Sequence, residues 1–245
     1  MQKICVIIPC YNEENRLDIK ALKDFIRNHP WICFLGVNDG SQDRTLNILQ
    51  NLHHEFKDQF RYFDLPKNAG KAEAVRQGIL QAHQTETFDY IGYWDADFST
   101  PLAEIDHFVA FSGGHLHHAF ILGSRISRLG SRINRKLYRH YLGRIFSTAT
   151  SFILKLHVYD TQCGAKLISA KEIDNLFSQP FISKWFFDVE LLARLKKQYG
   201  HEKTAEITLE VPLLEWNEIG GSKLKWMDFI KVPLEILKIK RHYKI

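Results

Sequence analysis

Short runs of β-branched and aromatic residues alternate with amphipathic helical stretches over the first 125 residues, and this alternation limits the possible folds more than any other feature of the chain. The runs with the composition of strands are residues 4–9, 31–37, 61–65, 90–94 and 119–122. The stretches between them carry apolar residues spaced three or four apart, as helices do. Strand and helix in alternation indicate an α/β fold, a parallel sheet with helices on both faces. Such sheets bind ligands in the loops that follow the strands.

The second half of the chain has a different pattern. Apolar spacing predicts a long helix over residues 133–157, another helix over 189–199 and an alternating strand over 205–211. The apolar stripe of the long helix includes Ile145, Phe146, Phe152 and Ile153. We find no linker, repeat or low-complexity tract in the sequence. We therefore expect one domain over residues 1–224, extended by a basic amphipathic helix at residues 225–245.

Composition excludes several classes of protein. No apolar run among the 245 residues approaches the ~18 residues of a membrane-spanning helix. The apolar stretch at residues 4–9 is too short for a signal peptide. The four cysteines lack the paired spacing of a metal site. We therefore expect a cytoplasmic protein with reduced thiols.

The net charge of +5 is unevenly distributed. Residues 223–245 carry seven Lys or Arg against two acids, which accounts for the whole excess. Between Asp106 and Asp160 there is no acidic residue, but there are eight Lys or Arg and six His. Any one such run also fits a solvated helix face. Two of them together favour an anionic surface or ligand.

Polar loops follow the first three expected strands. They are Pro9-Cys10-Tyr11-Asn12-Glu13, Asn38-Asp39-Gly40-Ser41 and Asn68-Ala69-Gly70-Lys71. The ring of Tyr11 and the carboxylate of Glu13 suit stacking on a base and hydrogen bonding to a ribose. Gly70 and Lys71 stand where a helix start could receive a phosphate. Each loop alone also fits an ordinary turn or helix cap.

The loop after the fourth strand carries the most specific signal. Asp95-Ala96-Asp97 places two carboxylates two residues apart, so in extended backbone they point the same way. Carboxylate oxygens are ligands for hard cations such as Mg²⁺. Two like charges placed together need positive charge to compensate them. A divalent ion that bridges to a diphosphate would supply it, and the alternative is a solvated surface turn.

In this order the four loops resemble family 2 glycosyltransferases of the GT-A fold. The matching segments are Val6–Glu13, Val37–Ser41, Asn68–Lys71 and Asp95–Asp97. Motifs in the second half look like the dolichyl-phosphate β-glucosyltransferase branch, which transfers a sugar from a nucleotide to a polyprenyl phosphate. Those motifs are Gly123–Arg125, Asp160–Lys166, Phe187–Leu192 and Trp216–Leu224. The resemblance implies a Rossmann-like GT-A fold with a mixed, mainly parallel sheet.

The resemblance also implies a role for each matching position. Donor binding is implied for Pro9, Tyr11, Asn12, Glu13, Asp39, Gly70, Lys71, Asp95, Ala96 and Asp97. Asp95 and Asp97 would hold Mg²⁺ or Mn²⁺ against the diphosphate, and Arg125 would approach the phosphates. Catalysis would depend on Asp97 and Arg125, with Asp188 as the candidate base. Asn38 departs from the family pattern, because many members have an aspartate there.

Two basic regions suit a lipid acceptor. In the tail, apolar residues such as Trp226 and Phe229 alternate with lysines, which predicts a helix lying on an anionic membrane surface. The alternative is a helix docked on the protein core. Arginines match phosphate oxygens, so an arginine-rich stretch is expected to receive the acceptor phosphate. Its members are Arg128, Arg132, Arg135 and Arg139.

We therefore expect an inverting, metal-dependent transferase that moves a hexose from UDP-glucose to a polyprenyl phosphate at the cytoplasmic face of a membrane. The first alternative is transfer to a saccharide or protein hydroxyl, which needs a base such as Asp188 or Asp160. Asp188 could instead stabilise a helix N-terminus. The second alternative is a non-catalytic nucleotide-sugar binding protein, which the retention of both Asp95 and Asp97 disfavours.

Other classes lack their motifs. There is no G-x-G-x-x-G after a strand and no G-x-x-x-x-G-K-[ST], which excludes a dehydrogenase and a P-loop enzyme. His115, His117 and His118 have no neighbouring cysteine or acid to complete a zinc site. No nucleic-acid partner is expected.

Overall fold

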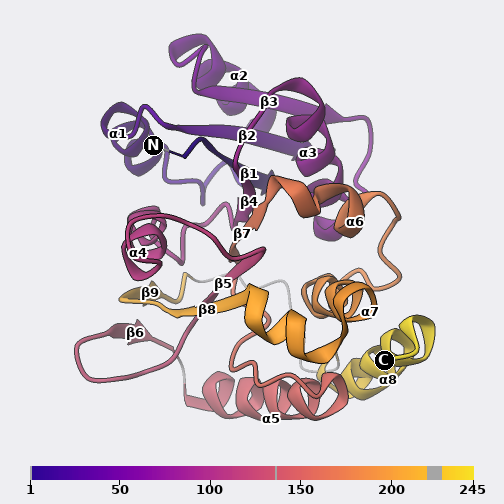
Figure 1. The fold of residues 1–245 in the computed structure, drawn as a ribbon. Coiled ribbons are helices and arrows are strands. Elements are labelled where there is room, and N and C mark those ends of the chain that lie inside the picture. Colours follow the sequence, from indigo (N-terminus) through magenta and orange to yellow (C-terminus); the bar gives the residue numbers. More distant parts are fainter. Residues whose placement is uncertain (1, 136, 220–227) are drawn as a thin grey trace.

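The computed structural model describes residues 2–135, 137–219 and 228–245. Its longer strands are β1 Ile4–Cys10, β2 Ile32–Asp39, β3 Phe60–Leu65, β4 Tyr90–Trp94, β5 Phe120–Ser124, β7 Ala165–Ser169 and β8 Thr208–Pro212. They form one sheet in the order β3-β2-β1-β4-β7-β5-β8 (Figure 1). All are parallel except β7, which is antiparallel to both neighbours. The expected mixed, mainly parallel sheet is confirmed.

Helices cover both faces of this sheet (Figure 1). They are α1 Ile19–Asn28, α2 Thr45–Glu55, α3 Lys71–Thr85, α4 Glu104–Phe111, α5 Leu137–Leu154, α6 Ile173–Phe177, α7 Phe187–Ile207 and α8 Asp228–Tyr243, with a 3₁₀ turn at Ala170–Glu172. One core cluster joins the sheet to α1, α2 and α4. The other joins it to α3, α5, α6, α7 and α8. The fold is therefore three layers, helices, sheet and helices.

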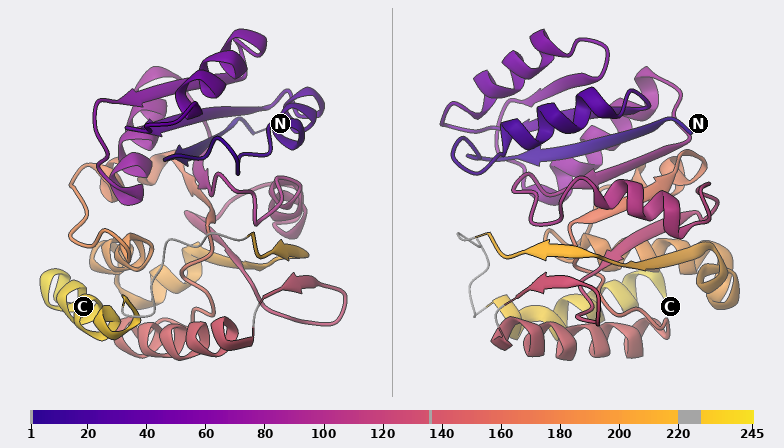
Figure 2. Two further views of the ribbon diagram at one scale, coloured as in Figure 1. Left: turned by 180° about the vertical axis from the view of Figure 1, so that it is seen from behind. Right: turned by 90° about the vertical axis from the view of Figure 1, so that its left-hand side faces the viewer.

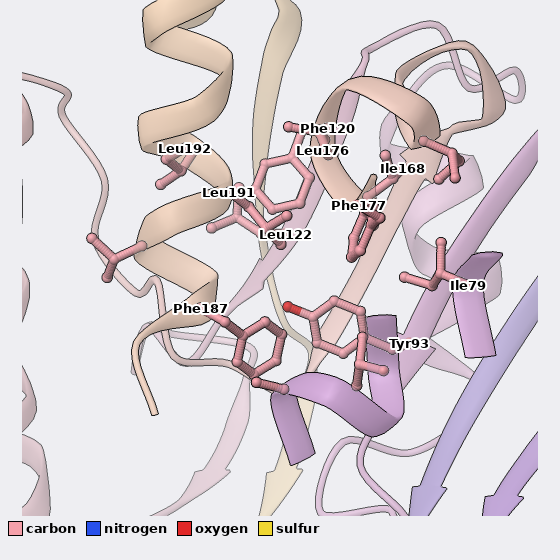
Figure 3. Close-up of a cluster of buried hydrophobic side chains, with 14 of the residues drawn as sticks. Ile79, Tyr93, Phe120, Leu122, Ile168, Leu176, Phe177, Phe187, Leu191 and Leu192 are labelled. Carbon is pink, nitrogen blue, oxygen red and sulfur yellow. The ribbon is translucent and has the colours of Figure 1, made fainter. Parts of the chain in front are cut away.

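Figure 3 shows the second core cluster between the sheet and α7. Tyr93 of β4 and Phe187 at the start of α7 lie 5.5 Å apart by ring centroids. Leu122 of β5 and Leu191 of α7 are fully buried in the same cluster. Burial of one such aliphatic side chain contributes about 1.5–3 kcal/mol to folding. This packing fixes the N-terminus of α7 beside the carboxyl end of β4.

Two sequence predictions in the second half are wrong. Residues 133 and 134, expected at a helix start, lie in strand β6 (Arg132–Asn134), which pairs with β9 (Glu215–Asn217). Residues 205 and 207, expected in a strand, lie in α7, which is interrupted at Gly200 with φ 78°. The strand begins at Thr208, where β8 meets Phe120 of β5. In both places pairing with a distant segment decides the local structure, and neighbouring residues do not reveal it.

The C-terminal helix α8 packs against α5 and α7 (Figure 2). Its residues Ile236, Ile239 and Tyr243 are buried. The hydroxyl of Tyr243 donates to Glu190 at 2.6 Å and accepts from Nε of Arg194 at 3.0 Å. The alternative expectation, a C-terminal helix docked on the protein core, therefore describes residues 236–243. Trp226 lies outside the described residues, as does the side chain of Phe229.

Among residues 2–135, 137–219 and 228–245, none of the helices combines the length and the hydrophobicity of a membrane-spanning segment.

Candidate active site

The loops after β1 and β2 are tied together at one edge of the sheet. Strand β1 pairs with β2 on one side and β4 on the other, so their carboxyl ends lie together. Asn12, at φ 52°, accepts from the Gln42 amide at 2.8 Å and donates its own amide to Ser41 at 3.0 Å. The Glu13 amide donates to Thr45 at 2.9 Å. These bonds hold the loop that carries Pro9, Tyr11 and Glu13, whose contact with a donor stays a prediction.

Asp39, at the end of β2, organises the loop before α3. Its buried carboxylate accepts from the amides of Ala69 at 2.7 Å and Gly70 at 2.9 Å, and from Nδ2 of Asn68 at 3.0 Å. Gly70 has φ 92°, which only glycine adopts at little cost. Asp39 was expected to bind the donor, and that contact stays a prediction. In this structure the Asp39 carboxylate fixes the turn that precedes Lys71.

Lys71, the first residue of α3, pairs with Asp95. Its Nζ lies 2.5 Å from Oδ1 of Asp95. Burial disfavours the charged amine, but attraction to nearby carboxylates outweighs burial and raises the pKa of Lys71. These carboxylates are Asp95, Asp188 and Asp97, in order of effect. The structure therefore gathers three acids around one lysine at the carboxyl end of β4.

Asp97 pairs with a residue that the sequence analysis missed. Nη2 of Arg16 lies 2.6 Å from Oδ2 of Asp97, and Nη1 lies 3.3 Å from Glu13. The other Asp97 oxygen accepts from the Ser99 amide at 3.0 Å. Arg16 thus joins the first and fourth loops. The signal for it was a basic residue three positions after Glu13, in a loop otherwise rich in acids.

Gly164 is a second residue without a predicted role of its own. A Cβ there would lie 1.9 Å from Oδ2 of Asp95, far inside van der Waals contact. The Asp95 amide also donates to the Gly164 carbonyl at 2.9 Å. The absent side chain therefore leaves the space that the Asp95 carboxylate occupies. The signal was the position of Gly164 inside the Asp160–Lys166 motif.

Arg125 is held by Asp160 in a two-pronged ion pair. Nε and Nη2 lie 2.6 and 2.8 Å from the two Asp160 oxygens. Glu210 of β8 in turn accepts from the amides of Tyr159 and Asp160 at 2.8 and 2.6 Å. Burial raises the pKa of Asp160, but Arg125 outweighs burial and the pKa is lowered. A carboxylate so engaged is a poor base, which argues against Asp160 in that role.

Asp188, the candidate base, lies in the first turn of α7 with two partners. Nζ of Lys166, whose side chain is fully buried, is 2.7 Å from Oδ1 of Asp188. The Tyr93 hydroxyl donates to the same oxygen. Burial first, and then Asp188, raise the pKa of Tyr93 well above its usual value, so the phenol stays protonated. Asp188 therefore compensates a buried lysine, and its role as a base stays a prediction.

The predicted acceptor arginines whose side chains the structure describes, Arg128, Arg132 and Arg135, do not lie together. Arg135 contributes to lowering the pKa of Asp160, after Arg125, and its guanidinium lies over Gly143. Arg128 and Arg132 are exposed on the loop and strand β6, and Arg132 pairs with Glu215 at 3.3 Å. The side chain of Arg139 lies outside the described residues. Of the three whose side chains are described, Arg135 alone lies near enough to the Arg125–Asp160 pair to act on the pKa of Asp160.

The donor atoms at the end of β4 suit a hard divalent cation. Asp95 and Asp97 offer carboxylate oxygens, and both face cationic side chains. Within residues 2–135, 137–219 and 228–245 no cluster of three or more His, Cys, Asp or Glu could hold a metal. Mg²⁺ is typically bound by one or two carboxylates plus substrate phosphates and water. The residues present therefore fit Mg²⁺ or Mn²⁺ bound together with a diphosphate.

The family follows from comparison with known sequences. The family described as glycosyl transferase family 2 matches residues 5–177. The chain belongs to this family. It is 31% identical to a dolichyl-phosphate beta-glucosyltransferase of Trichomonas vaginalis, over 99% of this chain and 74% of the relative. It is 29% identical to the Saccharomyces cerevisiae dolichyl-phosphate beta-glucosyltransferase, over 98% of this chain and 75% of the relative. The resemblance to this branch is confirmed.

Solved structures share the fold. Glucosyl-3-phosphoglycerate synthase of Mycobacterium tuberculosis with UDP matches with a TM-score of 0.68 at 16% identity, over 100% of this chain and 81% of that one. The same synthase with Mn²⁺, UDP and its product matches with a TM-score of 0.65 at 15% identity, over 99% and 80%. These matches support the GT-A architecture of the family 2 chain.

Proposed function

We propose that this protein transfers glucose from UDP-glucose to a polyprenyl phosphate, with inversion at the sugar. Relatives that align with nearly the whole chain are dolichyl-phosphate beta-glucosyltransferases. A structural neighbour binds UDP-glucose and Mn²⁺. A β-linked product formed from the α-linked donor requires inversion. We place the reaction at the cytoplasmic face of a membrane, and the free thiols of all four cysteines fit that reducing compartment.

One observation carries the choice of acceptor. Four acids expected at or near the site each meet a Lys or Arg, in the pairs Asp95–Lys71, Asp97–Arg16, Asp160–Arg125 and Asp188–Lys166. A carboxylate oxygen that already accepts from a cation is not free to accept a proton from an acceptor hydroxyl. A hydroxyl acceptor needs a base, whereas a phosphate monoester, with a second pKa near ~6, is already ionised at neutral pH. An acceptor that needs no base therefore fits this site best.

The charged residues of the site then have separate roles in the transfer. A divalent ion held by Asp95 and Asp97 would stabilise the negative charge that develops on the diphosphate leaving group. Lys71 supplies positive charge beside that group. Arg125 presents a guanidinium whose orientation Asp160 fixes, which suits a phosphate that must approach an anionic donor. Arg135 adds positive charge nearby.

A hydroxyl acceptor is the second candidate, because Asp188 is one of the carboxylates that raise the pKa of Lys71. To abstract a proton Asp188 would need an oxygen that reaches the acceptor. One of its oxygens already accepts from Lys166 and Tyr93. Among the described contacts, only the other oxygen of Asp188 is left to accept a proton from a hydroxyl acceptor.

The test compares two acceptors that differ in one group. Purified full-length protein is given UDP-glucose, Mn²⁺ and either a polyprenyl phosphate or the matching polyprenol. We expect glucosyl product with the phosphate alone. Product from the polyprenol would overturn the proposal in favour of a hydroxyl acceptor. GDP-mannose in place of UDP-glucose controls for the donor and should give no product.

A further inference from the structure

Arg16 lies on a turn whose backbone is held in place. The amides of Arg16 and Leu17 donate to the Glu13 carbonyl at 3.0 and 2.9 Å, and the Leu17 side chain is buried in the core. The Glu13 amide in turn donates to Thr45 at 2.9 Å. The Arg16 side chain itself remains partly exposed. Its guanidinium can therefore change partner by rotation of side-chain bonds, while the turn stays where it is.

Two carboxylates share this guanidinium. Nη2 of Arg16 lies 2.6 Å from Oδ2 of Asp97, and Nη1 lies 3.3 Å from both oxygens of Glu13. Of the two acids, Glu13 is the more buried. Because a buried carboxylate needs a cation beside it, Glu13 retains Arg16 at this place when Asp97 takes another partner.

Both acids expected to bind the metal are already engaged by cations of the chain. Oδ1 of Asp97 accepts from the Ser99 amide at 3.0 Å, and Arg16 holds Oδ2. Oδ1 of Asp95 lies 2.5 Å from Nζ of Lys71. A divalent ion that approaches either carboxylate meets a positive charge, and like charges repel. The ion displaces these cations only where something offsets the repulsion.

The charge balance of the site indicates what offsets it. Three carboxylates face two cations, so the group carries one net negative charge; its members are Glu13, Asp95, Asp97, Arg16 and Lys71. A divalent ion alone would make this group positive. A diphosphate that arrives with the ion returns the total to a negative value and gives the displaced cations a new partner. The charges therefore favour metal and diphosphate together over the metal alone.

We propose that Arg16 is a positioning residue that couples metal binding to nucleotide binding: it holds Oδ2 of Asp97 until a divalent ion arrives with the diphosphate, and then pairs with Glu13 alone. The inference rests on the proposed function, because it concerns the metal and diphosphate of that reaction. Arg16 acts through Asp97 and needs no contact with the sugar. By linkage, the metal strengthens nucleotide binding by the same factor as the nucleotide strengthens metal binding.

Mn²⁺ binding to the full chain tests this role without turnover. Free Mn²⁺ is followed by electron paramagnetic resonance in the absence of nucleotide. Arg16→Met removes the charge, and we expect it to bind Mn²⁺ about tenfold or more tightly than the unmodified protein does. Arg16→Gln, which keeps an N–H donor, should behave likewise, whereas Arg16→Lys keeps the charge and should bind as weakly as the unmodified protein.

Arg44→Met is the matched control. Arg44 pairs with Glu14, which belongs to the same loop as Arg16, but the Arg44 side chain is 81% exposed. Its removal changes the net charge by the same amount and should leave Mn²⁺ binding unchanged. Equal tightening in Arg44→Met would overturn the inference, because the effect would then come from net charge alone.

A purely structural role for Arg16 predicts the opposite sign. Loss of the contact would leave Asp97 less well placed, and both neutral variants would then bind Mn²⁺ more weakly than the unmodified protein; that result would overturn the inference. Adding Asp97→Asn to Arg16→Met should abolish the tighter binding. Tighter binding that persists in this double variant would place the ion elsewhere and would also overturn the inference.

Calorimetry with UDP separates this inference from the proposed function. We expect UDP to strengthen Mn²⁺ binding by about tenfold or more in the unmodified protein, and by a clearly smaller factor in Arg16→Met. An equal factor in the two proteins would overturn the inference. Failure of UDP to bind the unmodified protein with Mn²⁺ would overturn the proposed function, and the Mn²⁺ titrations without nucleotide would still decide the role of Arg16.

Discussion

The donor edge and the acceptor side of this protein handle charge in different ways. At the donor edge, the loops after β1, β2, β3 and β4, carboxylates meet partly exposed cations, with Lys71 38% and Arg16 24% exposed. At the acceptor side, Arg125 and Asp160 form a pair that is 14% and 8% exposed. Exposed ion pairs are weak, so their partners exchange readily, whereas breaking a buried pair is costly. The donor edge is therefore built to exchange cations, and the acceptor side to hold one in place.

The largest effect should come from the donor edge. Asp97→Ala removes the carboxylate that we assign to the metal, and we expect transfer to fall by about a thousandfold or more, because charge on the leaving group then lacks its main stabiliser. Asp95→Ala should also weaken transfer, though less. Product formation over a Mn²⁺ titration, with EDTA as a control, measures both. Undiminished activity in EDTA would refute the metal assignment.

A smaller loss should follow from a glycine that links the two regions. Gly164→Ala would place a Cβ 1.9 Å from Oδ2 of Asp95, so the carboxylate must move. A displacement of about 1 Å in a catalytic group can cost ~10²-fold, and we expect a loss of that order in kcat/KM. The midpoint of thermal unfolding should change little, because the clash is with the end of a side chain. Gly113→Ala, where nothing lies within 4 Å, is the control, although its φ of 76° adds strain. Normal activity in Gly164→Ala would show that Asp95 needs no fixed position.

The sequence predicts these two regions unequally, for physical reasons. Strand β4 was predicted at Tyr90–Trp94 and found there, and the donor loops follow strands whose composition is unmistakable. Arg16 and Gly164 were missed because each acts on a residue far along the chain, Arg16 on Asp97 and Gly164 on Asp95. Contacts of this kind depend on strand order, and the antiparallel insertion of β7 beside β4 leaves no local periodic signal.

Helix α5 shows a different limit of sequence reasoning. Its apolar spacing predicted the helix correctly, apart from the strand β6 at its start. The same spacing did not reveal which apolar residues face the core. An apolar stripe can be wider than the surface that packs against the core, and the sequence does not show which of its residues lie outside that surface. Phe146 is buried and Phe152 is exposed, although both belong to the predicted stripe. The distinction needs the position of α8, which lies about ninety residues later.

Helix α8 is expected to contribute to the stability of the protein core. Ile239 is fully buried where α8 packs on α5 and α7, so Ile239→Ala should lower the free energy of unfolding by about 2 kcal/mol or more. Lys238→Ala, at an exposed neighbour, is the control and should change it by less than ~0.5 kcal/mol. Urea unfolding measures both. Equal stability of the two variants would show that α8 contributes nothing to the core.

The smallest effect should appear in acid, at the pair that distinguishes the acceptor side. The pKa of Asp160 is lowered in the folded protein from an ordinary value of 3.8, because Arg125 outweighs burial. The unfolded chain then binds this proton first as the pH falls. The contribution of the pair to stability is therefore complete above about pH 4 and is lost as the pH drops through the folded-state value.

Asp160→Asn tests this linkage. The variant should be less stable than the unmodified protein at pH 7, by about 1–3 kcal/mol, since the buried Arg125 keeps only a neutral partner. The difference should shrink as the pH falls below 4, because the unfolded chain then binds a proton at Asp160 before the folded protein does. Thermal unfolding between pH 7 and pH 3 measures the two curves, and Asp106→Asn, at a more exposed carboxylate, is the control. If the two curves stay parallel over that range, the charge of Asp160 does not stabilise its pair with Arg125. The proposed difference between the acceptor side and the donor edge would then be wrong.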